Sequence, residues 1–293
     1  MSSNKTATIS AFIEGAPPGE LADVVSGLYH SIASHMILQL RSIEDIKALT
    51  PDDRDLLESA RPAFRKYNEE QLTTVKLPGG SQNILVSSFN ALEDGRYYDV
   101  ESQSSFAFDH ITQKASDVQP HSIDSEHSAL ISSLSKTLST HAQEHYPTST
   151  STVLPTTPTT LAILLTTSKY SPSNFWNGRL RATYTYTPST CTLTGSLKCD
   201  VHYYEDGNVR LTVSKSVPEI GVPGGGGAAG DVMRVIARVE KQWQEELNRG
   251  FGRLSEESFK GLRRQLPVTR QKVEWEKMGG YRAGKEIGGG GRR

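Results

Sequence analysis

The sequence predicts an α+β protein, with N-terminal helices, an antiparallel sheet meander covered by a long C-terminal helix, and a basic amphipathic tail. Three patterns favour this class: helical spacing of apolar residues before residue 72, alternation through residues 152–213, and an apolar stripe that starts at Val232. The chain has 293 residues, 35% hydrophobic and 22% charged. This length and composition allow a substantial core and exclude a disordered or membrane-embedded chain.

Residues 1–72 form the predicted N-terminal helical region. Pro17-Pro18-Gly19 interrupts the chain before a second apolar stripe. A further helix is expected to start with Thr50 as its N-cap and Pro51 at its first helical position. Pro62 is expected to kink that helix, because proline lacks the N–H of the helical hydrogen bond.

Short strands are predicted in residues 73–124, separated by turns at Gly79-Gly80 and Asp94-Gly95. Residues 125–220 are expected to hold a helix that ends at His145, before a proline, and then the antiparallel sheet. These patterns place the strands in two successive regions of the chain.

The strands of the predicted sheet carry apolar side chains at every second position, as at Leu180, Ala182 and Tyr184. Asp206-Gly207 is typical of a two-residue hairpin turn, because both positions of a type I′ turn need a positive φ. One face of the sheet is therefore expected to be apolar and covered by helices, and the other polar.

Residues 221–252 comprise a predicted glycine-rich linker and the most regular helix, for which Asp231 is the expected N-cap. The helix is expected to end near Gly250 and Gly252. Its apolar stripe should dock on the sheet and dominate the stability of the fold; the stripe consists of Val232, Val235, Ile236, Val239, Trp243 and Leu247.

Two short motifs imitate catalytic or binding sites. His141, Glu144 and His145 match an inverted zincin pattern, but no third ligand stands out, so we interpret them as a solvated helix end. Gly225, Gly227 and Gly230 have the spacing of a phosphate-binding loop, but they follow no strand and precede no lysine, so a linker is favoured.

Hydrolase, redox and secretory functions receive little support from the sequence. The G-x-S-x-G motif of a serine hydrolase does not occur. Cys191 and Cys199 are expected to be free thiols in a reducing compartment. The longest apolar run, residues 161–165, is too short to span a membrane, and no signal peptide opens the chain, so we expect a cytoplasmic protein.

The tail, residues 253–293, contains 11 Lys and Arg against 5 Asp and Glu. Lys260 and Arg264 would be neighbours on a helix, and Val273 and Trp275 provide apolar anchors between charges. An acidic partner with a hydrophobic groove would suit this mixture. A solvated tail, a basic adaptor for acidic surfaces, and binding to nucleic acid or an anionic membrane remain alternatives.

The string from Leu262 to Arg270, followed by Lys272 and Trp275, resembles the tentacle of F-actin-capping protein alpha subunits. Further segments similar to that family occur in the same order, namely Phe12-Ile13 with Ala16–Glu20, Tyr67-Asn68, Phe106–His110, Lys114–Asp117, Asn174–Arg179 and His202–Val209. Together they cover most of the chain, which makes the resemblance specific.

The resemblance implies an obligate heterodimer with a similar beta subunit, in which strands of both chains join one sheet below two long helices. It implies calcium-independent capping of actin filament barbed ends in the cytoplasmic actin cytoskeleton. Modulation by phosphoinositides and regulatory proteins is also implied. The resemblance does not imply enzymatic activity, a cofactor, a metal or nucleic-acid binding.

Carried over by position, the actin-binding residues are Lys260, Arg264 and Arg270, with Val273, Trp275 and Lys277 beside them. The chain departs from the family in three places. Ser26–Glu44 is an apparent excess, the linker at 221–230 is unusually rich in glycine, and Gly279-Gly280 stands where the amphipathic tail usually continues. We therefore expect a shorter or weaker last helix in the tail.

Overall fold

The computed structural model describes residues 2–21, 58–123, 125–146, 148–204, 209–223 and 229–254, and the chain forms two compact units, residues 1–240 and 241–293. The helices are α1 (Ser2–Glu14), α5 (Arg61–Glu70), α6 (Ser128–His145), the short 3-10 helix η2 (Pro172–Asn174) and α7 (Ala229–Arg253), which continues from the first unit into the second. The strands are β1 (Thr73–Lys76), β2 (Asn83–Val86), β3 (Tyr97–Asp99), β4 (Ser104–Asp109), β5 (Lys114–Pro120), β6 (Ser149–Thr157), β7 (Thr160–Ser171), β8 (Trp176–Thr187), β9 (Thr192–Tyr203) and β10 (Val209–Gly221).

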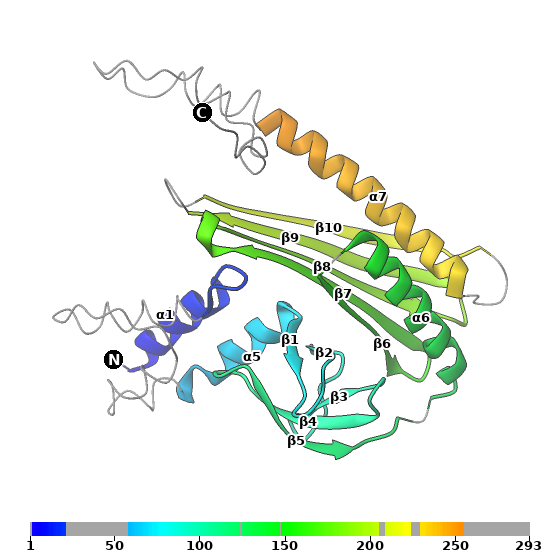
Figure 1. Ribbon diagram of the computed structural model, residues 1–293, viewed down its shortest axis with the longest axis horizontal. Coiled ribbons are helices and arrows are strands. Elements are labelled where there is room, and N and C mark those ends of the chain that lie inside the picture. The colour runs from blue at the N-terminus through cyan, green and yellow to red at the C-terminus, as the bar shows by residue number, and fades with distance from the viewer. Residues whose placement is uncertain are drawn as a thin grey trace, which may run out of the picture. The chain divides into compact units, whose positions relative to one another are not determined.

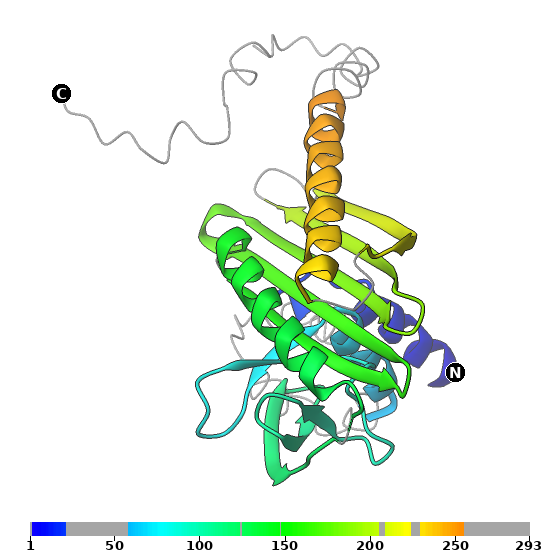
Figure 2. The same ribbon diagram turned by 90° about the vertical axis from the view of Figure 1, so that its right-hand side faces the viewer.

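The predicted meander is confirmed as a five-stranded antiparallel sheet with the order β10-β9-β8-β7-β6 (Figure 1). Within the first unit, α6 and the beginning of α7 cover one face of this sheet (Figure 2). Ala182 and Tyr184 of β8 are buried on that face, as are Leu134 and Leu138 of α6. Burying each large apolar side chain contributes about 1.5–3 kcal/mol, so this layer is a main source of stability.

The opposite face of the same sheet is also covered, by the turn after α1 and by α5 (Figure 1). The expectation that only the apolar face is buried is therefore wrong. Asn177, Arg179 and Arg181 of β8 alternate with the apolar positions and are nevertheless buried. Polar side chains are accepted there because the covering segments provide backbone carbonyls for the two arginines and the Glu20 carboxylate for Asn177.

The small strands predicted in residues 73–124 form two further antiparallel sheets, β1-β2 and β3-β4-β5. Gly79 and Gly95 adopt φ values of 77° and 82° in the connecting turns, as the turn signals predict. Tyr97, Phe106 and Phe108 belong to the core that these strands share.

The observed helix boundaries agree with the sequence for α6 but require corrections elsewhere. α6 ends at His145, as predicted. A turn at Ala60 precedes α5, so Pro62 lies in the first turn of a new helix rather than at a kink within a longer one. The expected cap at Thr50 and Pro51 lies outside the described residues.

α7 begins at Ala229, so Asp231 is not its N-cap but an acidic residue in its first turn, where it binds Arg234. The helix ends at Arg253, next to Gly252, where the sequence predicts its end. Within the first unit, Val232, Val235, Ile236 and Val239 of the stripe are buried.

β9 and β10 form the predicted hairpin, with Tyr203 paired to Val209. The loop between these paired residues is longer than two residues, and Asp206-Gly207 lies outside the described residues. Cys191 and Cys199 are both free thiols, as expected. No helix in the described part of the chain has the length and apolarity needed to cross a bilayer.

Candidate functional site

The predicted actin-binding residues Lys260, Arg264, Arg270, Val273, Trp275 and Lys277 lie outside the described residues, and so do Ser26–Glu44 and Gly279-Gly280. These assignments remain predictions. The described chain contains the sheet edge and the polar clusters that organise the first unit.

β10 forms an open edge of the five-stranded sheet. It pairs with β9 along its length, and no described strand pairs with its other side. Val217 is the only buried residue of β10, and Val209 is 55% exposed. Such an edge presents unpaired N–H and C=O groups to another strand.

The opposite edge, β6, is less suited to strand pairing. Pro155 interrupts it, because proline cannot donate a ladder hydrogen bond. The hydroxyl of Tyr98 donates to the carbonyl oxygen of Pro155 at 3.0 Å, so the small strands already bind this edge. The two edges of the sheet therefore differ in their capacity to receive a partner.

Two of the family-like segments meet at one end of the sheet. The backbone N–H of Tyr204 donates to the carbonyl oxygen of Phe175 at 2.9 Å, and the two rings contact edge to face with centroids 5.9 Å apart. Phe175 follows η2 with a φ of 57°, a left-handed conformation that is costly for a bulky residue. The contact with Tyr204 accounts for this conformation of the connection between β7 and β8.

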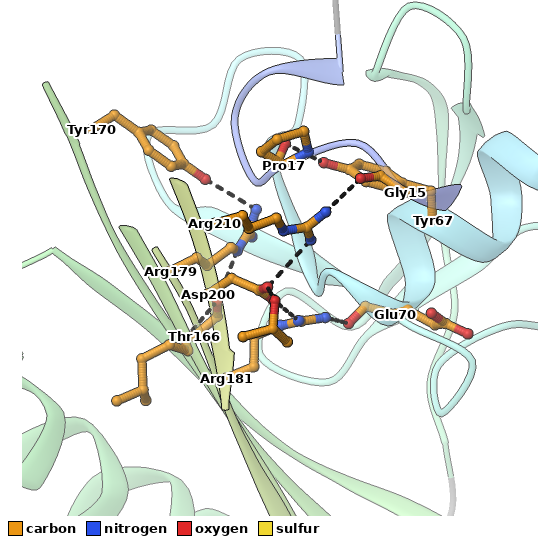
Figure 3. A network of polar contacts seen from close by, with 12 residues as sticks. Gly15, Pro17, Tyr67, Glu70, Thr166, Tyr170, Arg179, Arg181, Asp200 and Arg210 are labelled. Atoms are coloured by element: carbon orange, nitrogen blue, oxygen red, sulfur yellow. Dashed lines mark hydrogen bonds and ion pairs between the residues drawn. The ribbon is translucent and has the colours of Figure 1, made fainter. Parts of the chain in front are cut away.

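An arginine cluster, which we define as Arg179, Arg181 and Arg210 with Asp200, lies on the polar face of the sheet (Figure 3). Asp200 binds Arg181 at 2.6 Å and Arg210 at 3.2 Å, and it accepts a hydrogen bond from Thr212 at 2.6 Å. Burial lowers the pKa of Arg181, and the charge of Asp200 opposes that effect. The cluster therefore organises three strands around one carboxylate.

The same arginines attach the covering segments to the sheet. Arg181 donates to the carbonyl oxygen of Glu70 at the end of α5, and Arg210 donates to that of Gly15 after α1. Arg179 donates to the carbonyl oxygen of Leu72 at 2.8 Å. These bonds satisfy carbonyl groups at and beyond helix C-termini, where no further helical turn is available.

Tyr67 fixes the turn after α1. Its hydroxyl donates to the carbonyl oxygen of Pro17 at 3.0 Å, and burial raises its pKa strongly while Arg179 opposes the rise. In the same turn Gly19 has a φ of 81°, and the ring of Tyr170 lies 2.9 Å from the position a Cβ would take. Only glycine combines this conformation with this contact without strain.

Glu20 continues this turn into the sheet. Its carboxylate lies 2.7 Å and 2.8 Å from Nδ1 of His202, and Asn177 donates to it at 2.8 Å. His202 and Asn177 are paired across β9 and β8. The carboxylate thus joins three family-like segments that are far apart in the chain.

Glu240 of α7 is the centre of a second buried cluster, on the other face of the sheet. It accepts hydrogen bonds from the hydroxyls of Tyr146 at 2.8 Å and Tyr184 at 3.2 Å, and its carboxylate lies 2.9 Å from Nε2 of His141. Burial, followed by the charge of Glu240, raises the pKa of Tyr184. These bonds hold α6 and α7 on the sheet.

The interpretation of His141, Glu144 and His145 as a solvated helix end is wrong for His141. Its side chain is only 13% exposed, because α7 brings Glu240 against it. Glu144 and His145 are exposed, as expected. No group of three or more metal-ligating side chains occurs among the described residues. The motif is therefore part of a helix contact.

His110 forms a third polar cluster with Tyr97 and Glu69. The Tyr97 hydroxyl donates to Glu69 at 2.6 Å, so His110 Nε2, which is 3.1 Å from that hydroxyl, is the donor to it. Burial lowers the pKa of His110 to about 4. The imidazole is therefore neutral near pH 7.

The sequence reasoning did not identify the arginine cluster. The available signal was a pair of arginines at every second position of a strand, Arg179 and Arg181, with Asp200 on the next strand. Charged residues in this spacing are also typical of a solvent-exposed face. Nothing local to β8 indicates that α5 covers them.

Comparison with known proteins places this fold in a family. The model of the F-actin capping protein alpha subunit family matches residues 9–286. Proteins named F-actin-capping protein subunit alpha are similar to the chain, with 54% identity in Neurospora crassa and 31% in Caenorhabditis elegans, each over 97% of both chains. The structure of a homodimeric actin capping protein alpha subunit from Plasmodium berghei shares the fold, with a TM-score of 0.67, 17% identity, and coverage of 92% of this chain and 100% of that one. The chain therefore belongs to the F-actin-capping protein alpha subunit family.

Proposed function

We propose that the chain is the alpha subunit of a heterodimer that caps the barbed ends of actin filaments independently of calcium. The observation that carries this proposal is the alpha-subunit family match over residues 9–286. The family is named for capping actin, not for a reaction, which supports a non-enzymatic role in the cytoplasmic actin cytoskeleton.

A beta subunit is proposed to add strands to the open edge of β10. Two observations support this: no described strand pairs with the outer side of β10, and its side chains are mostly exposed. Backbone pairing at such an edge, together with burial of its side chains, would give a continuous sheet. The homodimer named in the Plasmodium berghei structure shows that a protein of this fold can dimerise.

The basic tail is proposed to bind acidic surface on the terminal actin subunits. Lys260, Arg264 and Arg270 would steer the heterodimer toward the filament end, and Val273 and Trp275 would slow its release through desolvated contacts. Lys277 adds to the cationic surface. The tail is also the proposed site of modulation by anionic phosphoinositides and regulatory proteins.

Co-expression with a capping-protein beta subunit tests the assembly. We expect a soluble 1:1 complex by light scattering after gel filtration, and an aggregating or self-associated chain without the partner. The heterodimer should then inhibit elongation of pyrene-labelled actin from filament seeds at nanomolar concentration, with or without a calcium chelator. Failure to inhibit elongation would contradict the proposal.

A triple variant of Lys260→Ala, Arg264→Ala and Arg270→Ala tests the tail. Capping affinity should fall at least about tenfold. Each of the three cations contributes a modest attraction to the acidic surface of actin, and the variant removes all three. The matched control is Lys76→Ala, Lys114→Ala and Lys136→Ala, which removes three exposed lysines elsewhere. Equal loss of affinity in both variants would indicate a net-charge effect and refute the residue assignment.

The adaptor alternative predicts a different outcome. A basic adaptor would bind acidic surfaces through its tail but would leave elongation from filament seeds unchanged. A hydrolase that uses the His141 motif is disfavoured, because His141 is held by Glu240.

A further inference from the structure

A polar pocket of about 380 Å³ lies beside the arginine cluster. Its lining is dominated by hydroxyl groups around one guanidinium, including Thr73, Thr150, Thr166, Ser168, Tyr170 and Arg179. This volume lies within the usual range of small-ligand sites, and the lining is suited to a polar ligand rather than an apolar one.

Arg179 is buried, with 8% of its surface exposed, yet no carboxylate in the described chain lies within ion-pair distance of it. Its Nε donates to Thr166 at 3.2 Å, and its two Nη atoms donate to Tyr170 at 3.2 Å and to the Leu72 carbonyl at 2.8 Å. A guanidinium has five N–H groups, so two remain available for an anion.

Asp200 does not neutralise Arg179, although the two residues are paired across β8 and β9. The Asp200 oxygens bind Arg181, Arg210 and Thr212. Arg181 and Arg210 share the Asp200 carboxylate, and Arg210 is 31% exposed to solvent. Arg179 is therefore the buried cation of the cluster that no described carboxylate binds, and such a charge favours a bound anion.

We infer that this pocket binds a phosphate group, with Arg179 as its charged anchor and the surrounding threonine and tyrosine hydroxyls as hydrogen-bond partners. A phosphate monoester carries a charge of about −1.5 to −2 near pH 7, which would compensate the guanidinium charge of Arg179. Guanidinium groups bind phosphate oxygens through paired hydrogen bonds, and hydroxyl groups complete the coordination.

Tyr170 lines the pocket beside Arg179. The residue is 43% exposed, and its hydroxyl accepts a hydrogen bond from Arg179 (Figure 3). Its ring lies close to Gly19. Because Arg179 is buried, we expect a soluble phosphate compound, not a group that stays in a membrane surface. The inferred site is separate in the chain from the basic tail and does not rest on the proposed actin function.

Calorimetric titration and ³¹P line broadening test the inference, with inorganic phosphate and glycerol 3-phosphate as probes at constant ionic strength. The full chain is used, in complex with a beta subunit where that complex forms. Arg179→Met should weaken binding at least about tenfold, the loss expected for a charged hydrogen-bonded contact. The control Arg234→Met, which removes an arginine that is 77% exposed, should bind as the unaltered chain does.

Two milder variants cover the case in which Arg179→Met does not fold. Tyr170→Phe and Thr166→Val each remove one hydroxyl that holds Arg179, and each should weaken binding several-fold. No binding by the unaltered chain, or unchanged affinity in the folded Arg179→Met chain, would overturn the inference; so would unchanged affinity in both milder variants. Vesicles containing phosphatidic acid separate the sources: binding that depends on Arg179 would identify a lipid phosphate, whereas Arg179-dependent binding of glycerol 3-phosphate alone would identify a soluble one.

Discussion

Arg181 and Asp200 form an ion pair across β8 and β9, with 2.6 Å between Nη2 and Oδ2 and side-chain exposures of 7% and 1%. Removing two charges from water is costly, and their attraction offsets that cost only while both partners are present. The pair therefore makes the polar face of the sheet sensitive to the loss of either residue.

Asp200→Asn is expected to destabilise the protein by about 3–5 kcal/mol, because it leaves two arginines facing a neutral amide in a buried site. Urea unfolding followed by circular dichroism measures this change. The double variant Asp200→Leu with Arg181→Met should recover part of the loss. Asp117→Asn, which breaks an exposed pair with Arg96, is the control and should have little effect. Similar losses in both aspartate variants would contradict the buried-pair argument.

Gly19→Ala should destabilise the protein more than Gly79→Ala. Both glycines have a positive φ, of 81° and 77°, but the Cβ at Gly19 would meet the Tyr170 ring at 2.9 Å, whereas Gly79 has open space. The conformational cost alone is about 1–2 kcal/mol at each position. Thermal unfolding measures the stability loss of each variant. The extra loss in Gly19→Ala over Gly79→Ala gives the cost of the contact between the added Cβ and the Tyr170 ring. That difference should shrink in a Tyr170→Ala background, and its persistence there would exclude Tyr170 as the cause.

Tyr184→Phe and Tyr186→Phe form a matched pair on one face of β8. The Tyr184 hydroxyl donates to Glu240, whereas the buried Tyr186 hydroxyl lies near the weakly hydrogen-bonding thiol of Cys191 and makes no hydrogen bond of normal geometry to a described residue. Removing the first hydroxyl should cost about 1–2 kcal/mol, and removing the second should be neutral or stabilising. Chemical unfolding of both variants measures these effects, and the reverse order would refute the assignment of Glu240 as acceptor.

Acidification should weaken the fold through His110. Burial lowers its pKa from the ordinary 6.5 to about 4, so the unfolded chain binds the proton more readily than the folded chain. Stability from this group is complete above pH 6.5 and decreases as the pH falls toward 4. After allowance for the partial exposure of the ring, we expect a loss of about 1–2 kcal/mol.

The free energy of unfolding, measured between pH 7 and pH 4, tests this expectation. His110→Gln should reduce the overall stability near pH 7, because the hydrogen bonds of the imidazole change. It should also flatten the dependence on pH in this window. An equally steep decline in the variant would assign the acid sensitivity to other groups.

Local patterns in the sequence were sufficient to predict the helices and strands whose apolar residues recur on the side that packs against the core. α6 ends at His145, as the following proline predicts, and the alternation at Ala182 and Tyr184 predicts strands of the antiparallel sheet. The basic tail and the family-like segments were also visible in the sequence, because rare strings of residues are recognisable without coordinates. The family assignment therefore needed no structure.

Tertiary structure decided which polar residues are buried. Arg179 and Arg181 alternate along β8 as residues of a solvent-exposed face would, and His141 lies on a helix with many polar neighbours. Only the docking of α5 and the turn after α1 buries the arginines, and only α7 brings Glu240 to His141. These contacts join residues about 100 positions apart, such as Leu72 with Arg179 and His141 with Glu240. A polar side chain is buried only where another part of the chain provides a hydrogen-bond or ion-pair partner. The spacing of residues within one strand or helix therefore does not predict this burial.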